Sequence, residues 1–143
     1  MPSNMFGNRV FIIEDSEPDR AVIGEMLAEY CTADKISYFE SGSSFETYLA
    51  SIATGNDSKP TLILVDLHLP DCSGVDLIRS IRSHPHFVAV PIVVLTGIVA
   101  SETITECYEA GANSYCLKAI DMHDYRKNLK SLTSFAPVVS RTS

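Results

Sequence analysis

The chain has 143 residues, the length of one domain with room for a substantial buried core. Its 18 acidic and 11 basic residues give a net charge of −7, which argues against direct nucleic-acid binding because phosphate contacts need a clustered positive patch. The sequence has neither an apolar run of roughly 18 residues nor a signal-peptide pattern, so we expect a cytoplasmic chain without a membrane segment.

The first predicted strand follows a flexible arm at residues 1–8. Arg9–Ile13 is an apolar run typical of a strand that is buried on both faces of a parallel sheet. It ends at two adjacent carboxylates, Glu14 and Asp15. Ser16 is then a candidate cap for a helix, whose first turn carries acids at the positive end of the helix dipole.

The middle of the chain predicts two further strands around a helix. Residues 36–39 form the short second strand, Ser43–Glu46 is a possible capping box, and an apolar face at helical spacing follows through Ile52. The run Thr61–Asp66 is the third strand and places Asp66 at a carboxyl end, where open α/β sheets keep their ligand sites. Because an unpaired carboxylate is costly inside a core, we expect Asp66 at the rim, near water or a cation.

A helix, a fourth strand and another helix come next. A loop that ends at Gly74 leads into the first of these helices, and Val90–Leu95 forms the strand that precedes Thr96. Ser101 is the candidate cap of the second helix, and Gly111 is suited to a left-handed cap at its end.

A fifth strand and a fifth helix complete the pattern. Residues 114–117 form the strand, which leads to Lys118, and residues 122–132 form the helix. Alternating strands and helices predict one α/β domain over residues 9–135, with a parallel sheet and helices on both of its faces. Residues 136–143 are predicted to be a tail.

Cysteines and histidines give no sign of a metal site. The four cysteines are scattered, none belongs to a CxxC pair, and none has a histidine at zinc spacing. We therefore expect free thiols in or near a core, as in a reducing compartment. The His-Pro-His segment at residues 84–86 is predicted to be an exposed loop.

Four of the five strands deliver polar residues to the carboxyl end of the predicted sheet. These residues are Glu14 and Asp15, Asp66, Thr96 with Gly97, and Lys118. Three carboxylates that converge there repel one another and need a cation, and oxygen ligands suit Mg²⁺. A metal flanked by a hydroxyl and a lysine stabilises a transferring phosphoryl group, and a carboxylate such as Asp66 can act as the nucleophile.

Together these motifs resemble the receiver domain of two-component response regulators. The resemblance covers roughly residues 8–133 and rests on Glu14-Asp15, the Val65–Gly74 loop, Leu95-Thr96-Gly97 and Leu117-Lys118. It implies a flavodoxin-like fold with the strand order 2-1-3-4-5. It also implies that Asp66 accepts a phosphoryl group from a histidine of a sensor kinase or of a phosphotransfer protein.

The resemblance further implies a Mg²⁺ site beside Asp66. Asp15 and Asp66 would bind the metal directly. The backbone carbonyl of His68 would be a third ligand, and Glu14 would act mainly through a bound water.

Three residues of the last two strands complete the implied site. Lys118 would neutralise phosphate oxygens, and Thr96 would turn its hydroxyl toward the phosphoryl group. Tyr115 would be the aromatic switch residue, although a partly buried strand tyrosine explains it nearly as well. The fourth helix, fifth strand and fifth helix would form the face that changes and binds a downstream protein, an output domain or a second copy.

Two positions depart from the usual pattern of the family. Ala119 follows Lys118 where most receivers have a proline, often behind a cis bond. A cis bond before a non-proline residue costs about 2.5–4 kcal/mol, so we expect a trans bond or a locally altered loop there. His68 stands two residues after Asp66, at a position where the family varies and where the phosphoryl lifetime is tuned.

Other functions fit the sequence less well. Ala119 allows a receiver-like interaction module that is never phosphorylated, but the intact acidic pair and Lys118 argue against it. A phosphatase of the haloacid dehalogenase type needs a second acid where this chain has His68. A flavodoxin would need a phosphate-binding loop after the first strand, where the acids of this chain would repel phosphate. We therefore expect no independent enzyme.

Overall fold

Five parallel strands alternate with five α-helices in the structure, a computed structural model that describes residues 8–52, 59–97, 100–118 and 121–131. The strands are β1 (Val10–Ile13), β2 (Ile36–Phe39), β3 (Leu62–Asp66), β4 (Ile92–Thr96) and β5 (Ser114–Leu117). The helices are α1 (Glu17–Leu27), α2 (Gly42–Ser51), α3 (Gly74–Ser83), α4 (Ser101–Ala110) and α5 (Met122–Lys130). The strand order β2-β1-β3-β4-β5 confirms the predicted flavodoxin-like fold.

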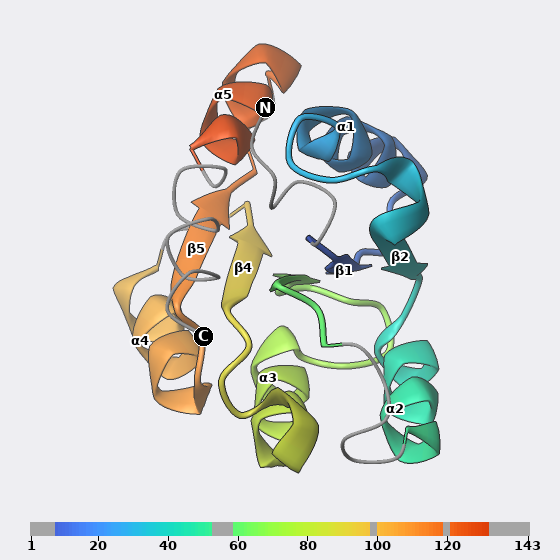
Figure 1. Ribbon diagram of the computed structural model, residues 1–143. Helices are drawn as coiled ribbons and strands as arrows, with labels where there is room; N and C mark the ends of the chain where they lie inside the picture. Colours follow the sequence, from blue (N-terminus) through green and yellow to red (C-terminus); the bar gives the residue numbers. More distant parts are fainter. Residues whose placement is uncertain (1–7, 53–58, 98–99, 119–120, 132–143) are drawn as a thin grey trace.

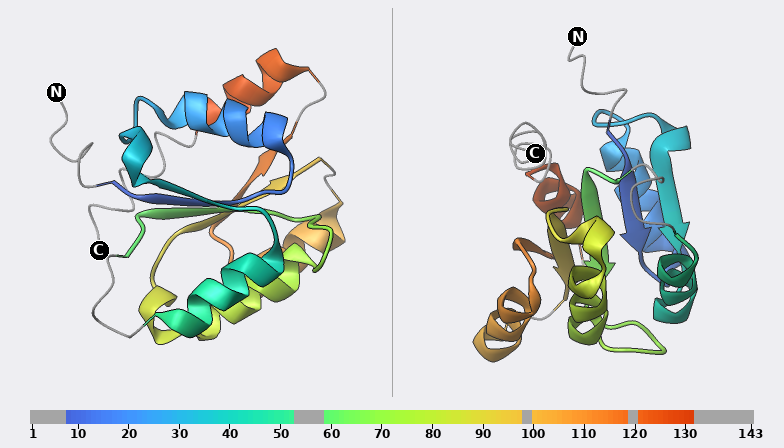
Figure 2. Two further views of the ribbon diagram at one scale, coloured as in Figure 1. Left: turned by 90° about the vertical axis from the view of Figure 1, so that its right-hand side faces the viewer. Right: turned by 60° about the horizontal axis from the view of Figure 1, so that its bottom comes forward.

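The helices cover both faces of the sheet. Helices α1 and α5 lie on one face, and α2, α3 and α4 lie on the other (Figure 1, Figure 2). Phe11 and Ile13 of β1 therefore enter one core, whereas Val10 and Ile12 enter the other. All residues of β1, β3 and β4 are buried, which explains their unbroken apolar sequences. No helix in the described ranges is long and apolar enough to cross a membrane.

Two helices begin differently from the sequence prediction. Helix α2 is capped by Ser41, whose Oγ accepts from the Ser44 N–H at 3.1 Å, while Ser44 Oγ accepts from the Ser41 N–H at 3.3 Å. The capping box therefore lies earlier than the predicted Ser43–Glu46. Helix α4 starts at Ser101 itself, and Ala100 occupies the cap position without a side-chain hydrogen bond.

A residue from outside α2 also binds the first turn of this helix. Asp71, in the loop after β3, accepts hydrogen bonds from the backbone N–H groups of Gly42 at 2.9 Å and Ser43 at 2.7 Å. These are two of the donors that a helix N-terminus leaves without an internal partner. Ser43 is therefore a residue of the first turn and not its cap.

The predicted caps at Ser16 and Gly111 are confirmed. Ser16 Oγ accepts from the Asp19 N–H at 3.3 Å and starts α1. Gly111 ends α4 with a φ of 123°, a conformation that side chains disfavour. A Cβ at this position would also lie 2.5 Å from Arg82 Cγ, so the backbone and the packing both require glycine.

The predicted N-terminal arm is anchored at its last residue. Asn8 is buried, and its Nδ2 donates to the Tyr30 carbonyl at 2.9 Å. Asn8 is therefore held against the segment that follows α1. Residues 1–7 and the predicted tail at residues 136–143 lie outside the described residues.

The prediction of an exposed loop at residues 84–86 is wrong. Pro85–Phe87 form a 3₁₀ turn, and His86 is only 2% exposed. The turn forms because proline begins it and His84 Nδ1 accepts from the His86 N–H at 3.1 Å. This places the His86 ring edge-on against Phe87, at a centroid distance of 5.0 Å.

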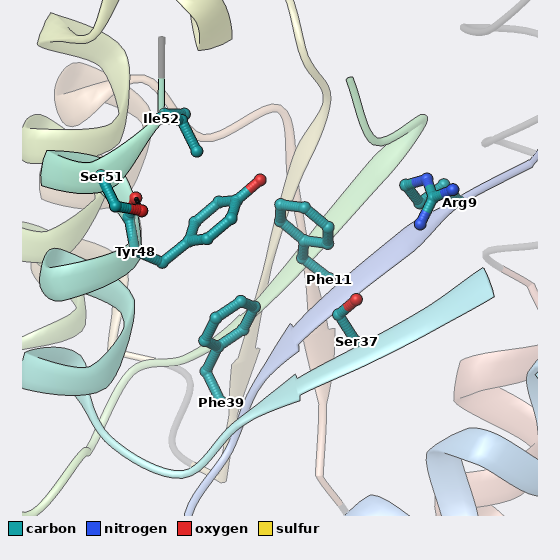
Figure 3. A pocket seen from close by; sticks show the side chains of 7 residues that line it. All are labelled: Arg9, Phe11, Ser37, Phe39, Tyr48, Ser51 and Ile52. Carbon is teal, nitrogen blue, oxygen red and sulfur yellow. Dashed lines mark hydrogen bonds between the residues drawn. The ribbon is translucent and has the colours of Figure 1, made fainter. Parts of the chain in front are cut away.

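An aromatic cluster fills the space between α2 and the sheet edge formed by β1 and β2. Phe11 makes edge-on contacts with Phe39 and Tyr48, at ring-centroid distances of 5.6 Å and 5.4 Å. Beside these rings opens a surface pocket of about 540 Å³, which is lined also by Arg9, Ser37, Ser51 and Ile52 (Figure 3). None of the strand-end carboxylates lines this pocket. It is therefore distinct from the site that the sequence predicts, although it is large.

Arg82 of α3 joins several segments by hydrogen bonds. Its Nε donates to the Gly111 carbonyl at 2.9 Å, and its Nη1 donates to the Val90 carbonyl at 2.6 Å. Its Nη2 donates to Asn113 Oδ1 at 2.7 Å, and the same oxygen accepts from the Ile92 N–H at 2.8 Å. The guanidinium thus holds the start of β4 and the end of α4 against α3.

Replacing Arg82 with alanine should lower the free energy of unfolding by about 2–4 kcal/mol, because several carbonyl groups lose a charged donor. Urea denaturation followed by circular dichroism measures this loss. Arg79→Ala is the matched control, since Arg79 lies on the same helix with its side chain 57% exposed. Its loss should cost about 1 kcal/mol or less. Equal losses in the two variants would contradict the role given to Arg82.

Candidate cation and phosphoryl site at the carboxyl edge of the sheet

The parallel register places three carboxylates at one edge of the sheet. Ile13 of β1 pairs with Val65 of β3, so Glu14 leaves its strand at the level of Asp66. One carboxylate oxygen from each of Glu14, Asp15 and Asp66 lies within 4.8 Å of the others. Glu14 and Asp66 are buried, whereas Asp15 is exposed and opens the group to solvent.

Lys118 closes the buried side of this acidic group. It follows β5, and its backbone N–H donates to the Thr96 carbonyl at 2.7 Å. Its side chain is only 19% exposed and contacts three carboxylates. The distances from Lys118 Nζ are 2.5 Å to Glu14 Oε1, 3.0 Å to Asp19 Oδ2 and 3.3 Å to Asp66 Oδ2.

The pKa values of Glu14 and Lys118 both lie above their ordinary values. Burial, with a further contribution from Asp66, raises the pKa of Glu14 to about 8, although Lys118 acts in the opposite direction. Burial by itself would lower the pKa of Lys118, but Glu14, Asp66 and Asp19 raise it above its ordinary value. Glu14 therefore holds its proton more tightly chiefly because it is buried, and Lys118 because carboxylates surround it.

The donor set fits a hard divalent cation. Glu14, Asp19 and Asp66 share the ammonium group of Lys118, and Asp15 adds a further carboxylate beside Glu14 and Asp66. Glu14 Oε1 is buried and has no hydrogen-bond donor of regular geometry, its contact with Lys118 being an ion pair. Carboxylate oxygens are the ligands that hard divalent cations prefer. Glu14, Asp15 and Asp66 therefore form a group that can hold such an ion.

The loop after β3 fixes the position of Asp66. Asp66 Oδ1 accepts from the backbone N–H of His68 at 3.0 Å, and the Gly74 N–H donates to the Leu67 carbonyl at 2.9 Å. A Cβ on Gly74 would lie 2.7 Å from Leu67 Cα and 2.8 Å from the Asp66 carbonyl oxygen. No side chain fits there without moving the backbone that carries Asp66. Asp71, in the same loop, ties it to the start of α2.

The other predicted site residues lie in different environments. Thr96 is buried at the end of β4, one strand away from Asp66. Tyr115 lies on the edge strand β5 and is 39% exposed. Ala119 lies outside the described residues, as does the conformation predicted for its peptide bond.

Sequence reasoning missed Asp19. It lies in the first turn of α1, where an acid is explained locally by the helix dipole and by the Ser16 cap. In the structure its carboxylate accepts a hydrogen bond from Lys118 Nζ, a partner 99 residues away. Only the fold brings these two residues together, so the local pattern held no signal of the contact.

A parallel sheet of this strand order, with carboxylates and a lysine at its carboxyl edge, has its candidate site where open α/β domains bind their ligands. The family model of the response regulator receiver domain matches residues 10–130. The chain belongs to this family of signalling domains, which are not independent enzymes.

Proteins of known sequence are similar over most of the chain. Response regulator Rcp1 of Synechocystis sp. is 27% identical over 127 residues, which cover 88% of this chain and 86% of the relative. Two-component response regulator ARR7 of Arabidopsis thaliana is 30% identical over 123 residues, covering 82% of this chain and 59% of that protein.

Solved structures share the fold. The phosphorylated cyanobacterial phytochrome response regulator RcpA superimposes with a TM-score of 0.79 at 28% identity, covering 90% of this chain and 92% of that one. The Mn²⁺-bound form of Rcp1 gives a TM-score of 0.77 at 28% identity, covering 90% and 93% of the two chains.

In metal-free buffer, the free energy of unfolding should fall as the pH rises from 4.5 to about 8. The pKa of Glu14 is about 8 in the folded chain against an ordinary 4.5, so the folded state keeps a proton that the unfolded state has released. This stabilisation is complete below pH 4.5 and is lost as the pH rises through about 8. Glu14→Gln should remove a contribution on the order of 2–4 kcal/mol to this fall in the free energy of unfolding.

Urea unfolding in the presence of a chelator, at about pH 5 and about pH 9, tests this dependence. Glu46→Gln is the control, because Glu46 is an exposed acid of α2 outside the acidic group. It should keep the wild-type slope. A Glu14→Gln variant with the same slope as wild type would refute the assignment.

Proposed function

We propose that Asp66 is the phosphoacceptor of this receiver domain. Its carboxylate oxygen attacks the phosphorus of a phosphohistidine on a sensor kinase or phosphotransfer protein, the P–N bond breaks, and an aspartyl phosphate forms. The observation that carries this proposal is the ammonium of Lys118 at 3.3 Å from Asp66 Oδ2, beside two further carboxylates. The similarity to a phosphorylated response regulator supports it.

The proposed cofactor is Mg²⁺, held by Asp15, Asp66 and the backbone carbonyl of His68, with Glu14 acting through a bound water. When bound, the metal supplies positive charge for the phosphoryl oxygens. Lys118 would supply a second positive group from the buried side, and the charge of the cation would favour the ionised form of Glu14. The Mn²⁺-bound structure of a relative supports a divalent cation in this family.

We further propose that phosphorylation changes the surface formed by α4, β5 and α5. Thr96 would direct its hydroxyl to the phosphoryl group, and Tyr115 would move with it. Tyr108, Leu117 and Met122 expose apolar surface on the same three elements, which suits a protein partner. That partner would be a downstream protein, an output domain or a second copy of the chain.

The proposed setting is the cytoplasm. All four cysteines, Cys31, Cys72, Cys107 and Cys116, are free thiols, which suits a reducing compartment.

Incubation with phosphoramidate or acetyl phosphate and Mg²⁺ should add one phosphoryl group per chain, because these small donors replace the phosphohistidine. Intact-mass spectrometry measures the gain. Asp66→Asn should show none. Asp76→Asn, which removes an exposed carboxylate of α3, should be phosphorylated like wild type. A mass gain that survives in Asp66→Asn would rule out the assignment.

Asp15→Asn should weaken Mg²⁺ binding by about tenfold or more, because the cation loses an exposed carboxylate ligand. Titration calorimetry measures the dissociation constant. Glu17→Gln removes an equal charge from the nearby first turn of α1 and should leave the affinity within about twofold of wild type. If wild type bound no Mg²⁺ at millimolar concentration, an interaction module that is never phosphorylated would be the better description.

A further inference from the structure

Asp19 competes with the phosphoacceptor for the same lysine. Lys118 Nζ lies 3.0 Å from Asp19 Oδ2 and 3.3 Å from Asp66 Oδ2. Of its three carboxylate contacts, the one with Asp19 also has regular hydrogen-bond geometry. In the unphosphorylated chain, the ammonium is therefore shared among Glu14, Asp66 and Asp19, and Asp19 has no part in the proposed phosphoryl transfer.

Asp19 stands apart from the acidic group that fits a cation. That group comprises Glu14, Asp15 and Asp66 and does not include Asp19. Asp19 is carried by the first turn of α1, and its backbone N–H is held by Ser16 Oγ at 3.3 Å. Its side chain is 23% exposed, so it meets Lys118 from the solvent side of α1. The carboxylate is thus held on a helix that does not depend on the loop of Asp66.

Phosphorylation would change the balance between the two contacts. A phosphoryl group on Asp66 adds about −1.5 to −2 charges and places its oxygens beyond the original carboxylate. Lys118 Nζ already contacts three carboxylates, so pairing with those oxygens would weaken its present contacts, the one with Asp19 among them. Because the Asp19 contact is better in the unphosphorylated state, it stabilises that state selectively.

We infer that Asp19 is a positioning residue that holds Lys118 in the unphosphorylated site and thereby sets how readily the domain becomes phosphorylated. This inference rests on the proposed function of Asp66. It assigns to Asp19 a part in regulating that site, through Lys118 and without contact with the phosphoryl group or the cation.

Asp19→Asn should raise the ratio of phosphorylated to unphosphorylated protein, at a fixed subsaturating concentration of phosphoramidate with Mg²⁺, by about threefold to tenfold. Asp19→Ser, a second neutral variant suited to a first turn, should do the same. Intact-mass spectrometry measures the ratio. Glu17→Gln removes a charge from the same turn without contacting Lys118 and should stay near wild type.

A second measurement reports on the contact without phosphorylation. The ¹⁵Nζ resonance of Lys118 should shift in unphosphorylated Asp19→Asn and not in Glu17→Gln. An unchanged resonance, or a phosphorylated ratio that is unchanged or lower in both Asp19 variants, would overturn the inference. If wild type itself takes no phosphoryl group on Asp66, the proposed function fails. If wild type is phosphorylated and the Asp19 variants match it, only the inference about Asp19 fails.

Discussion

The carboxyl edge of the sheet depends on one ammonium group placed among buried carboxylates. Lys118 contacts Glu14, Asp19 and Asp66, and Asp15 adds a further negative charge nearby. Buried charges persist only when they are paired, and here one lysine cannot balance all the acids. The remaining imbalance is offset either by a proton on Glu14 or by a divalent cation. This single constraint links proton binding, metal binding and phosphoryl chemistry in one small site.

The fold keeps this crowded edge in place with contacts that lie outside it. Gly74 allows the chain to turn closely past Asp66, and Asp71 fastens the same loop to the start of α2. Arg82 joins α3 to the end of α4 and to the segment that leads into β4. Repulsion among the carboxylates therefore acts on a framework that resists it. A site of this kind needs such support, because groups that repel one another would otherwise move apart.

The position of Lys118 connects the site to the surface of the domain. It follows directly on Leu117, an exposed residue of the edge strand that also carries Tyr115. A displacement of Lys118 toward a phosphoryl group would therefore act on β5 through the backbone. In the proposed switch, the contacts that Lys118 makes in the unphosphorylated chain would bias the domain toward one of two arrangements.

The sequence by itself determined the strands, their order of appearance and the polar residues at their carboxyl ends, because apolar runs and turn residues are local properties. The resemblance to receivers supplied the strand order. Tertiary structure alone decided that Asp71 binds the first turn of α2, that His86 is buried, and that Asp19 reaches Lys118. Most of these outcomes join residues far apart in the chain, and a local pattern carries no record of such a partner.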